Sequence, residues 1–175
     1  WGDIEINLFI SGLLINNCIA IKELKENPET QQWELSKFSL SIQSSAAAAL
    51  DWLERENFDN SQCWVSGFSF GSLIAMQLLM RRPEINRFIA ISPQPNVYDF
   101  SFLSPCPTSG LMIYGKKDEL VPLEYITELD KRLSAQKGIK VEFQSVPDAN
   151  HFFSKTEDSL TKNLEKYIKK ETALY

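Results

Sequence analysis

The stretch that decides the fold runs Cys63-Trp64-Val65-Ser66-Gly67-Phe68-Ser69-Phe70-Gly71. Its first four residues form a short apolar run that ends at Gly67, which predicts a buried strand. The residues from Ser72 to Arg82 are apolar on most faces and are stopped by Pro83, which predicts a buried helix. Between the two lies a G-x-S-x-G sequence, whose glycines permit a sharp turn that exposes the Ser69 hydroxyl.

The same order of strand and helix recurs along the rest of the chain. Two further apolar runs predict buried strands, a third run with polar residues interleaved predicts a strand near a sheet edge, and three further segments with helical spacing predict helices. Because the buried strands are continuously apolar and are joined by helical crossovers, we expect an α/β fold, a mostly parallel sheet with helices on both faces. The expected strands are Phe88–Ile91, Leu111–Tyr114 and Val141–Val146, and the expected helices are Ile42–Leu53, Leu123–Ser134 and Glu157–Lys169.

Length favours one domain over residues 1–175, with a recognisable core over 41–175, because 175 residues leave no room for a second core. The first forty residues are poorly assigned. Ile4–Ile10 fits a strand, Leu13–Lys25 fits a strand or a helix, and Asn27–Gln32 fits a loop. A start at Trp1 without methionine favours an incomplete chain.

Charge and composition exclude several classes of partner. The net charge of −5 opposes binding to nucleic acid or to an anionic membrane. The apolar N-terminal stretch is interrupted by polar residues and lacks a basic start, so neither a signal peptide nor a membrane span is expected. One histidine and three cysteines without C-x-x-C spacing predict no metal site, no cofactor and a cytoplasmic location.

The serine of the turn needs a base, and His151 is the single imidazole in the sequence. It follows the last expected strand, so it lies at the same sheet edge as Ser69. Asp118 follows the third expected strand at this edge and is the expected acid that orients the imidazole. The rival acids are Asp148, which is close to His151 in sequence, and Asp99, which follows the second strand.

An oxyanion site and a pocket are also expected near Ser69. The amide of Phe70, at the start of the helix, would bind an oxyanion. Aromatic side chains gather near the expected mouth and suggest an apolar acyl or aryl pocket, although most of them could instead belong to the core. These residues are Phe68, Phe70, Tyr98, Phe100, Phe102, Phe152 and Phe153.

From about Ser44 to Ile168 the sequence resembles the α/β-hydrolase superfamily, in particular small, lidless bacterial serine hydrolases similar to dienelactone hydrolases and peptidases. The order Ser69, Asp118, His151 is the order of that superfamily. The resemblance implies that Ser69 is the nucleophile, Asp118 the acid and His151 the base. The segments that carry it are Gly67–Gly71, Leu50–Leu53, Met80–Ile85, Tyr98–Leu103, Pro105–Pro107, Gly115–Pro122 and Asn150–Phe153.

The sequence departs from this family before Ser41, where the further strands, the loop that donates the second oxyanion amide and a glycine-rich turn are not found. The expected function is a serine hydrolase that cleaves an ester, thioester or amide of a small acyl compound. The alternative is a catalytically impaired hydrolase-fold binding module, or a fragment without a complete oxyanion hole. Acyl transfer to an alcohol other than water shares the acyl-serine step.

Overall fold

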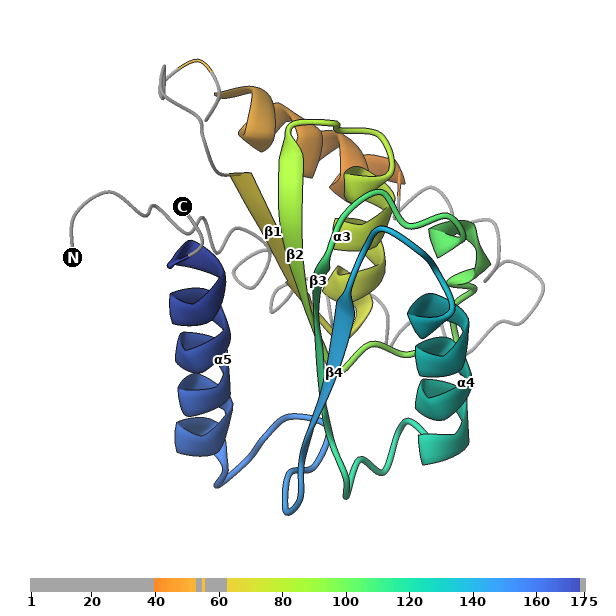
Figure 1. Cartoon of the computed structure of the whole chain (residues 1–175), viewed down its shortest axis with the longest axis vertical. Helices are drawn as coiled ribbons and strands as arrows, with labels where there is room; N and C mark the ends of the chain where they lie inside the picture. Colours follow the sequence, from red (N-terminus) through yellow and green to blue (C-terminus); the bar gives the residue numbers. More distant parts are fainter. Residues whose placement is uncertain (1–39, 53–54, 56–62, 174–175) are drawn as a thin grey trace.

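The structure is a computed structural model and describes residues 40–52, 55 and 63–173 (Figure 1). The strand, the strand or helix and the loop expected before residue 40 lie outside the described residues. The labelled elements follow a helix over residues 40–52. They are β1 (Cys63–Phe68), α3 (Phe70–Leu79), β2 (Ile85–Ile91), η1 (Ser101–Leu103), β3 (Gly110–Gly115), α4 (Leu123–Ser134), β4 (Val141–Val146) and α5 (Glu157–Thr172).

Within the described residues the strands form one parallel sheet in the order β1-β2-β3-β4. Neighbours in sequence are therefore neighbours in the sheet. Because parallel strands end at a common edge, the segments that follow all four strands meet there. This is the lower edge in Figure 1, where β3 leads into α4 and β4 leads into α5.

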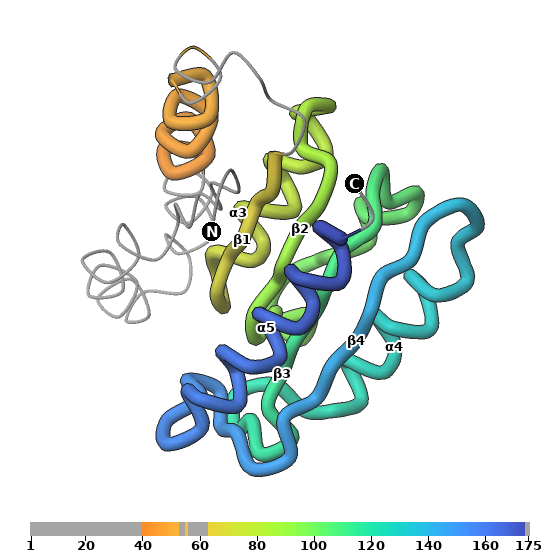
Figure 2. The backbone as a smooth tube through the Cα atoms, turned by 60° about the vertical axis from the view of Figure 1, so that its left-hand side comes forward, coloured from red at the N-terminus to blue at the C-terminus, as the bar shows by residue number. Residues whose placement is uncertain are grey.

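Helices cover both faces of the sheet, as the sequence predicted. Alternate residues of a strand point to opposite faces. Phe88 and Ala90 of β2 belong to a buried cluster with α3 and α4, whereas Ile89 and Ile91 belong to a second cluster with Tyr167 of α5. Burying one such large side chain contributes about 1.5–3 kcal/mol. Figure 2 shows α5 in front of the strands, and Figure 1 shows α3 and α4 on the opposite side of the sheet from α5.

Several element ends differ from the sequence prediction, whereas α4 and β4 have the predicted bounds. Helix α3 begins at Phe70 and ends at Leu79, earlier at both ends than predicted, because the turn at Ser69 leads straight into the helix. Strand β2 begins at Ile85, and α5 continues to Thr172. None of the helices in the described ranges is long and apolar enough to cross a bilayer.

Candidate active site

The turn between β1 and α3 holds Ser69 in an unusual backbone conformation, with φ 53° and ψ −118°. A residue other than glycine pays about 1–3 kcal/mol for such a conformation, and such strain is commonly found at functional sites. The turn is tight because a Cβ atom on Gly67 would lie 2.1 Å from the carbonyl oxygen of Gly71. The Ser69 amide donates to the Ile91 carbonyl at 2.8 Å, which anchors the turn to β2.

Ser72, in the first turn of α3, stabilises the turn that holds Ser69. Its fully buried hydroxyl donates to the Ser69 carbonyl at 2.6 Å, and its amide donates to that carbonyl at 3.0 Å. No acidic side chain lies in the first turn of α3, so the positive end of the helix dipole is not offset there. Phe70, the predicted oxyanion donor, is the first residue of this helix.

His151 joins Ser69 to Asp118 across three segments of the chain. Its Nε2 lies 2.9 Å from Ser69 Oγ, and its Nδ1 lies 2.8 Å from Asp118 Oδ2. The imidazole is buried, with 1% of its side chain exposed against 4% for Asp118. Since a carboxylate accepts hydrogen bonds, Nδ1 carries the proton toward Asp118, and the Nε2 lone pair faces the Ser69 hydroxyl.

Asp118 is held by the loop that follows β3. Its Oδ1 accepts from the amides of Leu120 at 2.8 Å and Val121 at 3.0 Å, which leaves Oδ2 for the imidazole. A Cβ atom on Gly115 would lie 2.2 Å from the Ala149 carbonyl oxygen. Glycine therefore allows the β3 loop to approach the loop that carries His151.

The rival acids lie elsewhere. Both carboxylate oxygens of Asp99 accept from Ser101, from its amide and its hydroxyl, each at 2.7 Å, and these hydrogen bonds lower the pKa of Asp99. Asp148 is exposed and pairs with Lys117 at 2.8 Å, and this hydrogen bond lowers its pKa. The carboxylate that contacts His151 in the structure is that of Asp118.

The backbone of His151 is fixed by Ser92, which sequence reasoning missed. Ser92 follows β2 directly, is fully buried and has φ 46°. Its hydroxyl donates to the His151 carbonyl at 2.7 Å. A serine in this position has no local sequence signal, because its partner is 59 residues away.

Some of the predicted aromatic residues flank the imidazole, whereas others belong to the core. Phe68 and Phe152 flank His151, with ring centroids 5.6 Å and 5.1 Å from the imidazole, and Phe152 is 60% exposed. Phe100 and Phe153 are almost completely buried and belong to the core. Phe102 stacks against Phe100.

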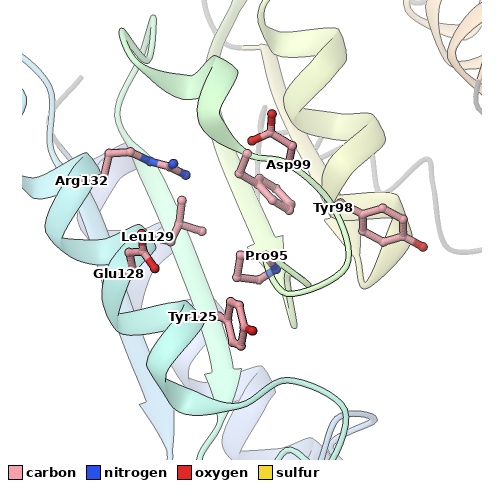
Figure 3. Close-up of a pocket in the computed structure, with 8 residues that line it drawn as sticks. Pro95, Tyr98, Asp99, Tyr125, Glu128, Leu129 and Arg132 are labelled. Carbon is pink, nitrogen blue, oxygen red and sulfur yellow. The ribbon is translucent and has the colours of Figure 1, made fainter.

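Tyr98 connects the serine turn to a neighbouring pocket. Its ring packs against Phe70 at 5.4 Å. The pocket, of about 190 Å³, lies between α4 and the loop that joins β2 to η1 (Figure 3). It is lined by Pro95, Tyr98, Asp99, Phe100, Tyr125, Glu128, Leu129 and Arg132.

Gln94 is a second site residue that sequence reasoning missed. Its Oε1 lies 3.2 Å from Ser69 Oγ, within hydrogen-bond distance. The signal that could have found it is its place just after β2, at the same sheet edge as the other three residues.

Over the described ranges, no group of three or more His, Cys, Asp or Glu side chains is placed to hold a metal ion.

Comparison with known proteins shows the family of the chain and its relatives. A family model described as the dienelactone hydrolase family matches residues 19–173. An uncharacterised protein of Rickettsia prowazekii is 45% identical over 127 residues, which cover 70% of this chain and 53% of that protein. The chain therefore spans about half the length of this relative.

Solved structures are also similar to the chain, and two of them are described here. The crystal structure of a protein of unknown function from Agrobacterium tumefaciens, described as a candidate α/β hydrolase, is 49% identical with a TM-score of 0.73, and the match covers 75% of this chain and 60% of that one. An α/β serine hydrolase homologue from Coxiella burnetii is 26% identical with a TM-score of 0.62, covering 70% and 56%. These matches confirm the fold that the sequence resemblance implied.

Proposed function

The chain belongs to the dienelactone hydrolase family, and from this premise we propose that it is a serine hydrolase that cleaves an ester, thioester or amide bond through an acyl-serine intermediate. The observation that supports this most strongly is the continuous hydrogen-bond chain from Ser69 Oγ through both ring nitrogens of His151 to Asp118. The proposed substrate is a small acyl compound. The proposed location is a reducing compartment such as the cytoplasm, because the odd number of cysteines without C-x-x-C spacing does not indicate a disulfide framework.

In the first half of the reaction, Ser69 Oγ forms a bond to the carbonyl carbon while its proton passes to His151 Nε2. The π electrons of the carbonyl move onto its oxygen, and the Phe70 amide donates a hydrogen bond to that oxyanion. The bond to the leaving group then breaks as the carbonyl re-forms. The leaving group takes the proton from Nε2 and departs as an alcohol, thiol or amine.

Water repeats the sequence in the second half. His151 Nε2 removes a proton from water as the water oxygen attacks the acyl carbon, and the second tetrahedral intermediate collapses with loss of Ser69 Oγ. Ser69 takes back the proton from His151, and the carboxylic acid is released. Asp118 stays ionised throughout, and its buried charge stabilises the imidazolium formed in each half.

Hydrolysis of p-nitrophenyl acetate by the purified chain tests the proposal. Ser69→Ala removes the nucleophile, and we expect kcat to fall by about 10⁶-fold. The matched control is Ser134→Ala, because Ser134 lies on α4 and its hydroxyl donates to Asp130. The control should retain the wild-type rate.

Two outcomes would contradict the proposal. Hydrolysis by Ser69→Ala at a rate near that of wild type would show that Ser69 is not the nucleophile. A folded wild-type chain that hydrolyses neither esters nor thioesters would favour the alternative of a hydrolase-fold binding module. Product analysis with an added alcohol separates hydrolysis from acyl transfer, since only transfer yields a new ester.

A further inference from the structure

Gln94 is a polar side chain that touches the reacting serine but has no part in the proton transfers of the proposed function. It lies in the loop between β2 and η1, and its backbone carbonyl accepts from the amides of Val97 at 3.1 Å and Tyr98 at 3.0 Å. These bonds form a turn that fixes the start of the loop. The carboxamide is partly buried, and its Oε1 lies 3.2 Å from Ser69 Oγ.

The hydroxyl of Ser69 has one hydrogen and two acceptors within reach. His151 Nε2 is the nearer, at 2.9 Å, and Gln94 Oε1 is the other. When the hydrogen goes to His151, the Gln94 carboxamide can turn its NH₂ group toward Oγ, because an amide presents a donor and an acceptor of similar shape. Either way, the resting contact with Gln94 depends on the free serine.

Acylation changes the partner that Gln94 needs. Once Oγ carries the acyl group it has no hydrogen to donate, so Oε1 can no longer accept from it. In the other orientation the NH₂ group faces an ester oxygen, which is a poorer acceptor than a hydroxyl oxygen. A partly buried amide without a partner is unfavourable. The acyl group now lies where the hydroxyl hydrogen was, and a substituent on its α carbon is separated from Oγ by two carbon atoms. Such a substituent lies within reach of a carboxamide that itself touches Oγ.

The pocket that begins at Pro95, the residue after Gln94, favours a neutral substituent. Its charged lining residues are Asp99, Glu128 and Arg132. Figure 3 shows Tyr125 and Arg132 extending from α4 toward the loop that carries Pro95. Two acids against one arginine disfavour an anionic substituent, and a neutral carboxamide has no charge to balance an ion.

We propose that Gln94 is a specificity-determining residue whose carboxamide binds a hydroxyl on the α carbon of the acyl group, so that the substrate class is esters of α-hydroxy acids. This inference rests on the proposed function. It predicts discrimination between two acyl groups that differ by one hydroxyl. A site that hydrogen-bonds a substrate hydroxyl discriminates against the analogue that lacks it, because the protein group is then left unpaired.

The test compares kcat/KM for p-nitrophenyl lactate and p-nitrophenyl propionate, which share a leaving group and differ in the α-hydroxyl. Gln94→Leu removes the carboxamide, and we expect the ratio of lactate to propionate to fall by about 10-fold from wild type. The higher intrinsic reactivity of the lactate ester cancels, since both proteins are measured on the same pair. Gln94→Met serves in the same way if the leucine variant does not fold, as judged by circular dichroism.

Gln144→Leu is the matched control. Gln144 lies on β4 two residues after Glu142 and therefore on the same face of the sheet. Glu142 pairs with Lys170 of α5, so Gln144 faces α5 rather than the pocket beside α4. Its ratio should equal that of wild type.

Each result has one meaning. An equal ratio in wild type and in a folded Gln94 variant, with hydrolysis that still requires Ser69, would overturn this inference and leave the proposed function standing. Absence of Ser69-dependent hydrolysis of both esters would overturn the proposed function, and the inference with it. A ratio that falls equally in Gln144→Leu would show that the effect is general and would also overturn the inference.

Discussion

Asp118→Asn tests the role of the carboxylate with the smallest change in shape. In the structure Oδ1 accepts from the amides of Leu120 and Val121, and Oδ2 faces His151 Nδ1 at 2.8 Å. An asparagine that keeps the two backbone hydrogen bonds must turn its NH₂ group toward Nδ1. The imidazole then has to accept at Nδ1 and carry its proton on Nε2, where it cannot take the proton of Ser69.

The size of the effect follows from this change of tautomer. The same replacement in a serine protease of another fold lowers kcat by about 10⁴-fold, which corresponds to about 5.4 kcal/mol of transition-state free energy. The opposite amide orientation would restore the imidazole but would set an NH₂ group against two backbone N–H groups, at about 1–3 kcal/mol for each lost bond. We therefore expect the first orientation and the large loss of activity.

The assay is kcat for p-nitrophenyl acetate, with circular dichroism to show that the variant is folded. Asp148→Asn is the matched control, because Asp148 is three residues from His151 but is exposed and pairs with Lys117. Its kcat should stay within a factor of ten of wild type. The reasoning is refuted if Asp118→Asn stays within that factor as well, or if both variants lose activity equally.

Two further predictions concern stability. Gly67→Ala places a Cβ atom 2.1 Å from a backbone carbonyl oxygen in the first turn of α3. We therefore expect the free energy of unfolding, measured by urea denaturation, to fall by about 1–3 kcal/mol or more. An unchanged urea midpoint would contradict this expectation and show that the turn can relax. The side-chain hydrogen bond from Lys170 lowers the pKa of Glu142. A carboxylate with a lowered pKa stabilises the fold above its unfolded pKa, about 4.3, and this stabilisation is lost as the pH falls through the folded value. The free energy of unfolding of Glu142→Gln should therefore be lower than that of wild type at pH 7, and the two values should converge below about pH 4. A difference between the two proteins that stays constant over that pH range would contradict the stabilising role of the Glu142 charge.

The sequence predicted the elements best where the local pattern was strong. The bounds of β4 and α4 were correct, and α4 follows a proline that cannot donate a backbone hydrogen bond. The start of α3 was placed two residues late, at Ser72, because the contact between Gly67 and Gly71 is a property of the folded turn and not of helix propensity.

The site residues were also predicted best where the sequence carries a local signal. Ser69, Asp118 and His151 were found together because each follows a strand in a parallel sheet, and the structure brings them into hydrogen-bond contact. Ser92 and Gln94 also follow a strand, but their types carry no motif, and their partners lie far away in sequence.

The aromatic residues show a second limit. Phe100 and Phe152 looked alike in the sequence, yet one is 1% exposed and the other 60%. Both are phenylalanines in loops at the predicted site, so hydrophobicity alone could not separate a core residue from one at the surface. Only the packing of the loops distinguishes them.

The central claim is that folding makes Ser69 a nucleophile by placing it against His151. The most direct measurement is reaction of the native chain with a fluorophosphonate, followed by mass spectrometry of its peptides. We predict one adduct, on Ser69, and none when the chain is first unfolded in urea. A folded chain that stays unmodified, or that carries the adduct on another serine, would contradict the claim.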